Sequence, residues 1–185
     1  MKISFIRPED YKLMPWKNGG GSTREVLRCP LDLEKFDWRI SIAEVNTSGP
    51  FSLFPGCDRS LTLLSGKGMI LQTSNTKHRI SHCFQPYFFS GEEFIEAKLI
   101  DGPCTDFNVI WDRAKYSTEI TFIEKPFTLE VDDQCIIFDC RSQCTTYLIP
   151  EFENDRTLLK MDSPIIKIKL KRKNLALRET QSPQD

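Results

Sequence analysis

Short runs of alternating apolar and polar residues recur along almost the whole chain, and this period of two limits the fold more than any other feature. In residues 36–45, FDWRISIAEV, Trp38 and Ile40 fall on one face of a strand, whereas Arg39 and Ser41 fall on the other. Gly, Pro, Asp or Asn separate such runs, and no apolar stripe of helical spacing is sustained before the C-terminal segment. The sequence therefore predicts an all-β fold in which closure or stacking of sheets hides the strand edges.

A change in composition near residues 112–117 divides the chain into two parts. We expect residues 1–114 to form a first β unit, residues 115–171 a second and smaller unit packed on it, and residues 172–185 a partly disordered tail. Within the first unit, residues 60–71, SLTLLSGKGMIL, contain two apolar runs around Ser-Gly-Lys-Gly. This arrangement predicts a tight hairpin.

The charge balance and the distribution of apolar residues exclude several classes of partner. Lys and Arg total 25 against 26 Asp and Glu, so the chain lacks the basic surplus that drives nucleic-acid binding. No apolar run reaches the length of a membrane span, roughly 18 residues, and the N-terminal segment becomes charged before a signal peptide could form. We expect a cytoplasmic protein that binds neither nucleic acid nor membrane.

The cysteines and histidines do not form a recognisable metal site. Seven cysteines are an odd number and none falls in a C-x-x-C pair. Cys135, Cys140 and Cys144 lack the spacing of a zinc site, and only His78 and His82 could add nitrogen ligands. We therefore expect reduced thiols, no metal and no cofactor.

Three consecutive glycines in PWKNGGGSTREV, residues 15–26, mark a candidate loop at a pocket. Asn18-Gly19 is a strong turn signal, and the next glycines allow positive φ or a close approach of main chain to a ligand. Such a loop would place Trp16 as an apolar wall and Lys17 or Asn18 as donors. A flexible connection between two strands is the alternative.

Residues 49–59, GPFSLFPGCDR, form a second candidate, an aromatic turn that ends in an arginine. Arg59 would stand at the entrance of a strand, where a guanidinium group can bind a carboxylate through two hydrogen bonds. A surface salt bridge to Asp58 or Glu44 is an equal alternative.

Polar residues share strand faces elsewhere in the first unit, but alternation alone does not decide whether those faces enclose a cavity or meet solvent. If they turn inward, the interior holds a set of donors and acceptors suited to a small polar molecule: Glu25, Arg39, Arg59, Asp106 and Asn108. No nucleophile motif of the G-x-S-x-G type is present, so catalytic residues stay unassigned.

Four segments, PWKNGGGSTREV, FDWRISIAEV, GPFSLFPGCDRSLTLLSG and DFNVIWDR, in this order and at these separations, resemble the HutD/Ves family. The resemblance covers residues 14–113. It implies a bicupin of the cupin superfamily, with two β-barrel or jelly-roll-like halves in one chain. It also implies a cytoplasmic bacterial protein connected with histidine utilisation or stress, without an assigned enzymatic activity.

The resemblance implies a metal-free pocket, because the chain has no H-x-H pair and too few histidines for the usual cupin metal site. The matching motif residues are the ligand-binding candidates: Trp16, Asn18, Thr23, Glu25, Arg39, Ser41, Arg59 and Asn108. The implied ligand is a small carboxylate or amide, such as an intermediate of histidine breakdown.

Two alternatives stay open. One is a low-turnover, metal-free hydrolase or isomerase that uses Glu25 or Asp106 as its base. The other is a protein-interaction module that uses a sheet edge or the basic segment KIKLKRKNLALR, residues 167–178. Whether the protein forms a homodimer is left undecided.

Overall fold

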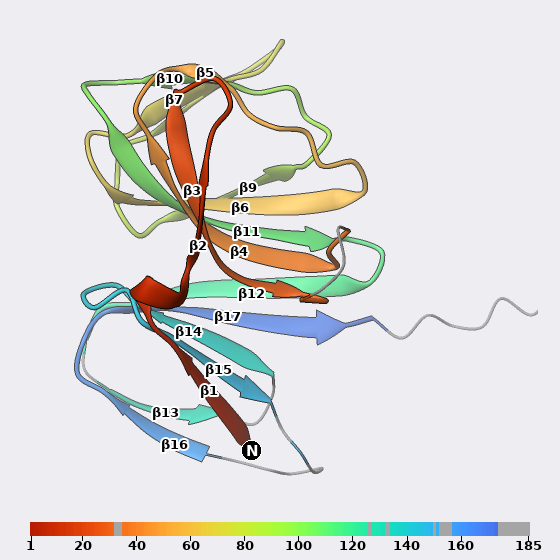
Figure 1. Cartoon of the computed structure of the whole chain (residues 1–185), viewed down its shortest axis with the longest axis vertical. Coiled ribbons are helices and arrows are strands. Elements are labelled where there is room, and N and C mark those ends of the chain that lie inside the picture. The colour runs from red at the N-terminus through yellow and green to blue at the C-terminus, as the bar shows by residue number, and fades with distance from the viewer. Residues whose placement is uncertain (32–34, 126, 132–133, 150, 152–156, 174–185) are drawn as a thin grey trace, which may run out of the picture.

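The computed structural model describes residues 1–31, 35–125, 127–131, 134–149, 151 and 157–173. Antiparallel strands dominate these residues, which confirms the predicted all-β fold. A short 3-10 helix, η1 (Pro8–Asp10), links β1 to β2. Among the described residues, no helix has the length and apolar character needed to cross a membrane. The strands form two halves, one above the other in Figure 1.

The first half consists of a six-stranded and a four-stranded sheet. The larger sheet contains, in spatial order, β2 (Lys12–Pro15), β3 (Gly21–Cys29), β4 (Trp38–Val45), β11 (Cys104–Asp112), β6 (Cys57–Ser65) and β9 (Pro86–Ser90). The smaller sheet contains β5 (Gly49–Pro50), β10 (Glu96–Leu99), β7 (Met69–Gln72) and β8 (Lys77–Ile80).

The second half consists of a five-stranded sheet and a two-stranded ribbon. The sheet contains, in spatial order, β1 (Lys2–Ile6), β15 (Thr145–Ile149), β14 (Cys135–Asp139), β17 (Ile165–Arg172) and β12 (Tyr116–Ile123). The ribbon pairs β13 (Phe127–Val131) with β16 (Thr157–Met161).

The N-terminal strand β1 belongs to the sheet of the second half. The first unit expected from the sequence, residues 1–114, therefore differs from the observed first half at its N-terminal end. β1 pairs with β15 from Lys2 opposite Ile149 to Ile6 opposite Thr145, and the chain enters the first half only at β2. A five-residue strand carries too little pattern to identify a partner more than a hundred residues away, because alternation specifies faces and not neighbours.

The predicted hairpin at residues 60–71 is wrong. The two strands form as expected, but β6 lies in the six-stranded sheet while β7 pairs with β8 and β10 in the other sheet. Gly66 and Gly68 have φ of +93° and +87°, and a Cβ on Gly68 would lie 1.9 Å from the carbonyl oxygen of Ile80. The glycines therefore turn the chain around a corner between two sheets.

The two faces of β4 serve different purposes, as its alternation predicts. Ile40 and Ile42 are fully buried in an apolar cluster that joins the six-stranded sheet of the first half to the five-stranded sheet of the second. In the same cluster the rings of Phe107 and Phe138 lie 4.6 Å apart, which connects β11 to β14. The opposite face of β4 carries Arg39 and faces the interior of the first half.

Candidate functional site

A cavity of about 440 Å³ opens in the first half. Its walls come from the inward face of the six-stranded sheet, from the loop between β2 and β3, and from the segment around β5. Seven of the eight residues that the sequence singled out line it: Trp16, Asn18, Thr23, Arg39, Ser41, Arg59 and Asn108.

The glycines of the β2–β3 loop bring Trp16 to the cavity. Gly19 has φ of +70° and donates its N–H to the carbonyl of Trp16 at 3.0 Å, which closes a turn. A Cβ on Gly21 would lie 2.2 Å from the carbonyl oxygen of Glu44 and 3.0 Å from the indole ring. The indole N–H donates to Thr23 Oγ1 at 2.8 Å, so the ring is fixed in place.

Two further side chains of this loop reach the cavity. The side-chain oxygen of Asn18 accepts a hydrogen bond from the N–H of Gly20 at 3.0 Å, which leaves its NH₂ group for a ligand. Lys17, which the sequence offered as an alternative donor to Asn18 but which is not among the eight ligand-binding candidates, also lines the cavity. The loop is therefore a built wall with a cation, and not only a connection between strands.

Glu25 binds Arg39 and does not line the cavity. Its Oε2 atom accepts from Arg39 Nε at 2.7 Å and lies 4.0 Å from Arg28 Nη1. A register shift between Glu25 and Leu27 disturbs the alternation of β3 at this point. Within the described part of the chain, the two terminal nitrogens of Arg39 have no hydrogen-bond partner, so they are available to a ligand.

Arg59 is buried among aromatic rings. Its guanidinium carbon lies 5.2 Å from the ring centres of Phe51 and Phe54 and 4.9 Å from that of Phe89. Nη1 donates to the carbonyl of Ser52 at 3.0 Å, while Nε is buried without a described partner. Burial lowers the pKa of Arg59 to about 10, so the group is still charged at neutral pH.

The surface salt bridge that was the alternative for Arg59 does not form. Asp58 instead accepts from Arg113 at 2.9 Å, and Glu44 lies 3.6 Å from Arg24. The sequence flagged the turn at residues 49–59, but it did not identify Phe51, Ser52 and Phe54 as lining residues. Their signal was the two phenylalanines held between two prolines and two glycines.

Asp106 and Asn108 share the inward face of β11 and connect to Arg59. The amide of Asn108 donates to Asp106 Oδ1, and its oxygen accepts from Arg59 Nη2 at 3.2 Å. Only 1% of Asp106 is exposed, and this burial raises the pKa of its carboxyl to about 7, although the charge of Arg59 and the bond from Asn108 act in the opposite direction.

The lining carries more positive than negative charge. Lys17, Arg39 and Arg59 supply three cations, and Asp106 is the single acidic lining residue. Because the raised pKa of Asp106 keeps part of its carboxyl protonated near neutral pH, the cavity favours an anion.

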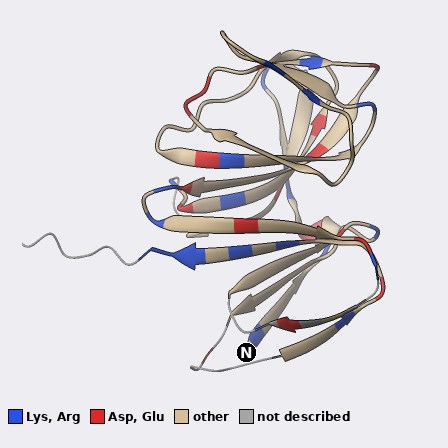
Figure 2. Ribbon diagram, turned by 180° about the vertical axis from the view of Figure 1, so that it is seen from behind, with Lys and Arg blue, Asp and Glu red and all other residues tan. Residues whose placement is uncertain are grey.

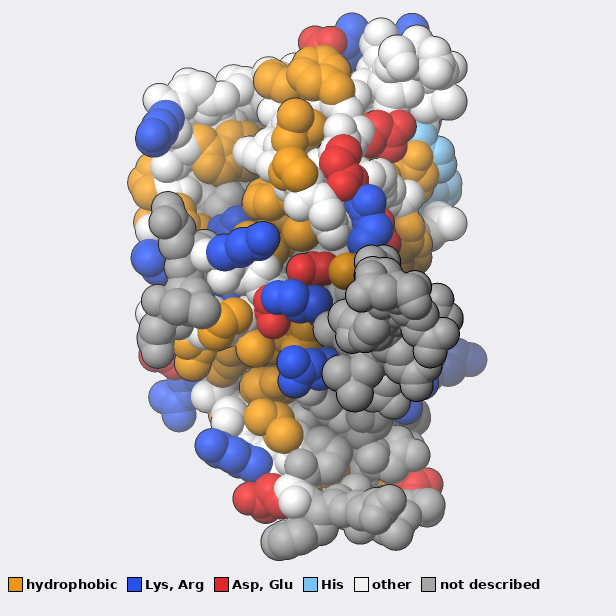
Figure 3. Space-filling model, turned by 90° about the vertical axis from the view of Figure 1, so that its right-hand side faces the viewer, with side chains coloured by type: hydrophobic (Ala, Val, Ile, Leu, Met, Phe, Trp, Pro, Cys, Tyr) orange, Lys and Arg blue, Asp and Glu red, His pale blue; other side chains and the backbone are white. Residues whose placement is uncertain are grey.

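The histidines lie away from this cavity. His78 and His82 line a separate hollow of about 180 Å³, where the His78 ring stacks on Tyr87 at 3.9 Å. Figure 3 shows histidine in pale blue at the margin of the first half. Among the residues that the structure describes, no group of three or more His, Cys, Asp or Glu side chains is placed to hold a metal ion.

Comparison with known proteins assigns the family. The HutD family model matches residues 8–181. An uncharacterized 21.2 kDa protein in the hutC 3' region of Pseudomonas putida is 39% identical over 124 residues, which are 66% of this chain and 65% of that protein. Protein Ves of Escherichia fergusonii is 35% identical over 123 residues, 64% of each chain. The matched part thus spans slightly less than two thirds of these two relatives.

A solved structure covers more of the chain. HutD from Pseudomonas fluorescens SBW25, determined in a formate condition, superposes with a TM-score of 0.80 and 30% identity over 93% of this chain and all of that one. Agreement of sequence motifs, family model and fold leads to one conclusion: the chain belongs to the HutD family.

Proposed function

We propose that the first half binds a small carboxylate in its cavity, and that the protein acts by binding this metabolite in a regulatory or stress-related role. The observation that carries the proposal is the lining of three cations against one carboxyl that burial keeps partly protonated. A volume of about 440 Å³ fits a small metabolite, since ligand sites typically measure roughly 300–1,000 Å³. A neutral amide would leave these cations without a counter-charge, so the proposal favours a carboxylate.

Each lining group has a distinct task in this proposal. The free terminal nitrogens of Arg39 bind the carboxylate, and Arg59 supplies a second cation at the apolar end. Trp16 covers an apolar part of the ligand. The side-chain amide of Asn108 is hydrogen-bonded to Arg59 and Asp106. Asn108 therefore positions these two groups more than it contacts the ligand.

The names of relatives support a narrower choice of ligand. Two relatives carry hut in their names, HutD and the protein in the hutC 3' region, and the family resemblance connects that name with histidine utilisation. We therefore include acids formed in histidine breakdown among the proposed ligands.

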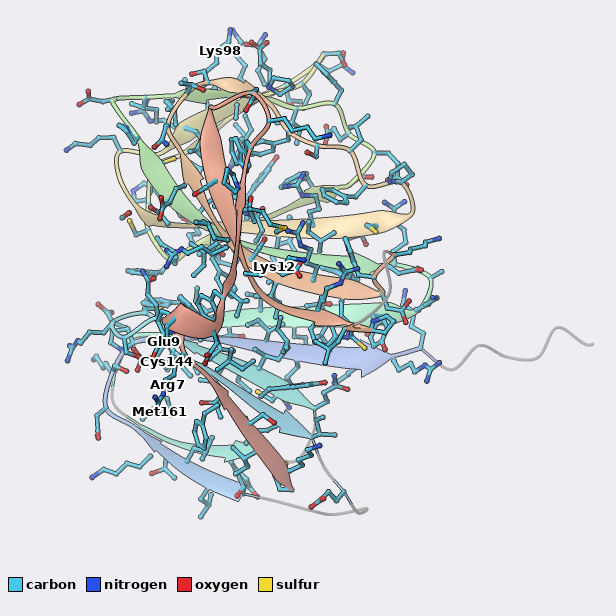
Figure 4. All side chains as sticks on the ribbon, viewed as in Figure 1. Arg7, Glu9, Lys12, Lys98, Cys144 and Met161 are labelled. Carbon is cyan, nitrogen blue, oxygen red and sulfur yellow. The ribbon has the colours of Figure 1, made fainter. Side chains whose placement is uncertain are left out.

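Isothermal titration tests the proposal directly. Acetate, propionate, succinate and glutarate are compared with the corresponding neutral amides, which match them in size. We expect acids to bind and amides not to bind, and we expect Arg39→Gln to weaken binding at least tenfold, because a charge-assisted hydrogen bond contributes about 1.5–3 kcal/mol. Lys98→Gln is the matched control, since Lys98 projects outward from the first half (Figure 4) and is exposed. Equal binding of acids and amides, or of neither, contradicts the proposal.

The environment of Asp106 supports catalysis as a second candidate function. A carboxyl with a pKa of about 7 on the wall of a cavity suits a general base, whereas Glu25 is bound to Arg39. Asp106→Asn would then abolish turnover of a bound acid, followed by NMR of the ligand, without abolishing binding. An unchanged spectrum of the ligand after long incubation with the wild-type protein argues against this candidate.

The interaction module has less support. In β17 the lysines alternate with buried apolar residues, and Figure 2 shows the cations spaced along the strand. β17 pairs with β14 on one side and β12 on the other, so it is not a free sheet edge. Residues 174–178 of the basic segment lie outside the described residues.

A further inference from the structure

The buried carboxyl of Asp106 has no described cationic partner in direct contact. Among the described residues it forms no salt bridge, and its one hydrogen bond comes from the amide of Asn108 to Oδ1. Asp106 lines the cavity, and this hydrogen bond involves its Oδ1 atom and not Oδ2. Arg59, whose positive charge acts to lower the pKa of Asp106, directs its own hydrogen bonds to Ser52 and Asn108.

The surroundings of Asp106 do not favour its ionised form. Ala43 of β4 and Leu63 of β6 stand opposite it in the neighbouring strands. Both belong to an apolar cluster that includes Leu71 of β7 and Ala97 of β10. A carboxylate in such a place loses hydration that one amide hydrogen bond does not replace.

The charged and titratable groups that face Asp106 come from few elements. β6 supplies Arg59, and β11 itself supplies Cys104, whose pKa is raised to about 12 by burial and by the charge of Asp106. Arg39 of β4 and Lys17 of the β2–β3 loop line the same cavity. Burial places the pKa of Arg59 at about 10 and that of Cys104 at about 12, whereas the pKa of Asp106 is about 7. Among these three buried groups, Asp106 is therefore the one that titrates near neutral pH.

We propose that Asp106 makes anion binding in the first half proton-linked: the carboxyl is protonated in the complex and donates its O–H to the bound carboxylate. This inference rests on the proposed function and adds to it the residue that determines the charge of the acceptable ligand. An ionised Asp106 repels a bound carboxylate, whereas a protonated one contributes a donor beside Arg59. The site therefore binds the acid in its ionised form, while the proton in the complex is held by Asp106.

The raised pKa of Asp106 sets the expected size of the pH dependence of anion affinity. Below about pH 7 the carboxyl is already protonated and binding needs no proton from solution. Above this pH each unit makes the competent form about tenfold rarer, so the affinity for an acid falls by up to about tenfold per pH unit.

Calorimetric titration with glutarate from pH 6 to pH 9 tests the inference, because glutarate is mostly the dianion at pH 6 and fully ionised from pH 7 upward, where the affinity is expected to change. We expect affinity to fall above pH 7, and paired buffers of different ionisation enthalpy to show uptake of about one proton at pH 8 and almost none at pH 6. Asp106→Asn should bind glutarate with little pH dependence and, at pH 8, about tenfold more tightly than the wild type.

The controls separate this inference from the proposed function. His78→Gln is the control and should keep the pH dependence, because His78 lies in the other hollow and not in the anion cavity. Glutarate binding that is constant from pH 6 to pH 9, or that strengthens with pH, overturns the inference and leaves carboxylate binding intact. Absence of binding at pH 6 overturns both. If Asp106→Asn does not fold, the proton uptake of the wild type still decides.

Discussion

Replacing Asp106 by Asn should remove a pH-dependent loss of stability that the wild-type chain carries. The pKa of this carboxyl rises from 3.8 to about 7 on folding, mainly through burial. At 1.36 kcal/mol per unit of pKa, this corresponds to about 4 kcal/mol. A raised pKa means that the folded chain holds the proton longer than the unfolded chain. The contribution is therefore fully present below about pH 4 and is lost as the pH rises to about 7.

Urea unfolding of both proteins at pH 5, 6, 7 and 8 measures this effect. The other titrating groups are common to the two chains and cancel in the difference. We expect the free energy of unfolding of Asp106→Asn, relative to the wild type, to increase by about 1.4 kcal/mol per pH unit from pH 5 to pH 7 and to level off above it. Parallel curves over the whole range would refute the reasoning, because they would show that Asp106 is already ionised at pH 5 in the folded protein.

Four other substitutions test the fold and the site. Phe107→Ala should destabilise the chain by about 3–5 kcal/mol in urea unfolding, with both halves unfolding in one transition, since the ring is buried in the cluster that joins them; two separate transitions would contradict this. Gly21→Ala should lower the free energy of unfolding by about 1–3 kcal/mol, because the new Cβ would overlap the backbone of Glu44. It should also make the Trp16 indole more accessible to a fluorescence quencher, because the same Cβ would press on that ring. Gly19→Ala is the matched control: its new Cβ would have nothing within 4 Å, so it should cost only about 1–2 kcal/mol of backbone strain and leave quenching unchanged. Equal quenching in the two variants would contradict the claim that close packing at Gly21 holds the Trp16 ring. Glu25→Gln removes the ion pair at 2.7 Å and should weaken carboxylate binding in calorimetry by loosening Arg39, not by removing a base; unaltered affinity would show that the pair does not position Arg39.

Strand faces were the part of the fold that could be predicted, because burial on one side of a pleated strand imposes a period of two. Ile40 and Arg39 occupy the opposite faces that alternation assigns to them. Strand partners could not be predicted in the same way. Pairing depends on contacts between distant segments, which is why β1 joins β15 and why β6 and β7 separate into different sheets.

The candidate site shows the same limit. Motif residues such as Trp16 and Arg39 do line one cavity. Whether Arg59 was buried depended on Phe89, thirty positions further along the chain, and this contact has no local signature. The irregular register at Glu25 and the burial that raises the pKa of Asp106 likewise arise only once sheets form. The sequence pattern identified the candidate residues, whereas tertiary packing determined the charge state of Asp106 and whether each side chain faces the cavity.

The proposed function requires an anion site inside the first half. A crystal structure of the protein soaked with glutarate tests it most directly. We expect a carboxylate between Arg39 and Arg59, with one oxygen within hydrogen-bond distance of Asp106. Glutarate found only on the outer surface, or a metal ion occupying the cavity with these side chains as bystanders, would contradict it.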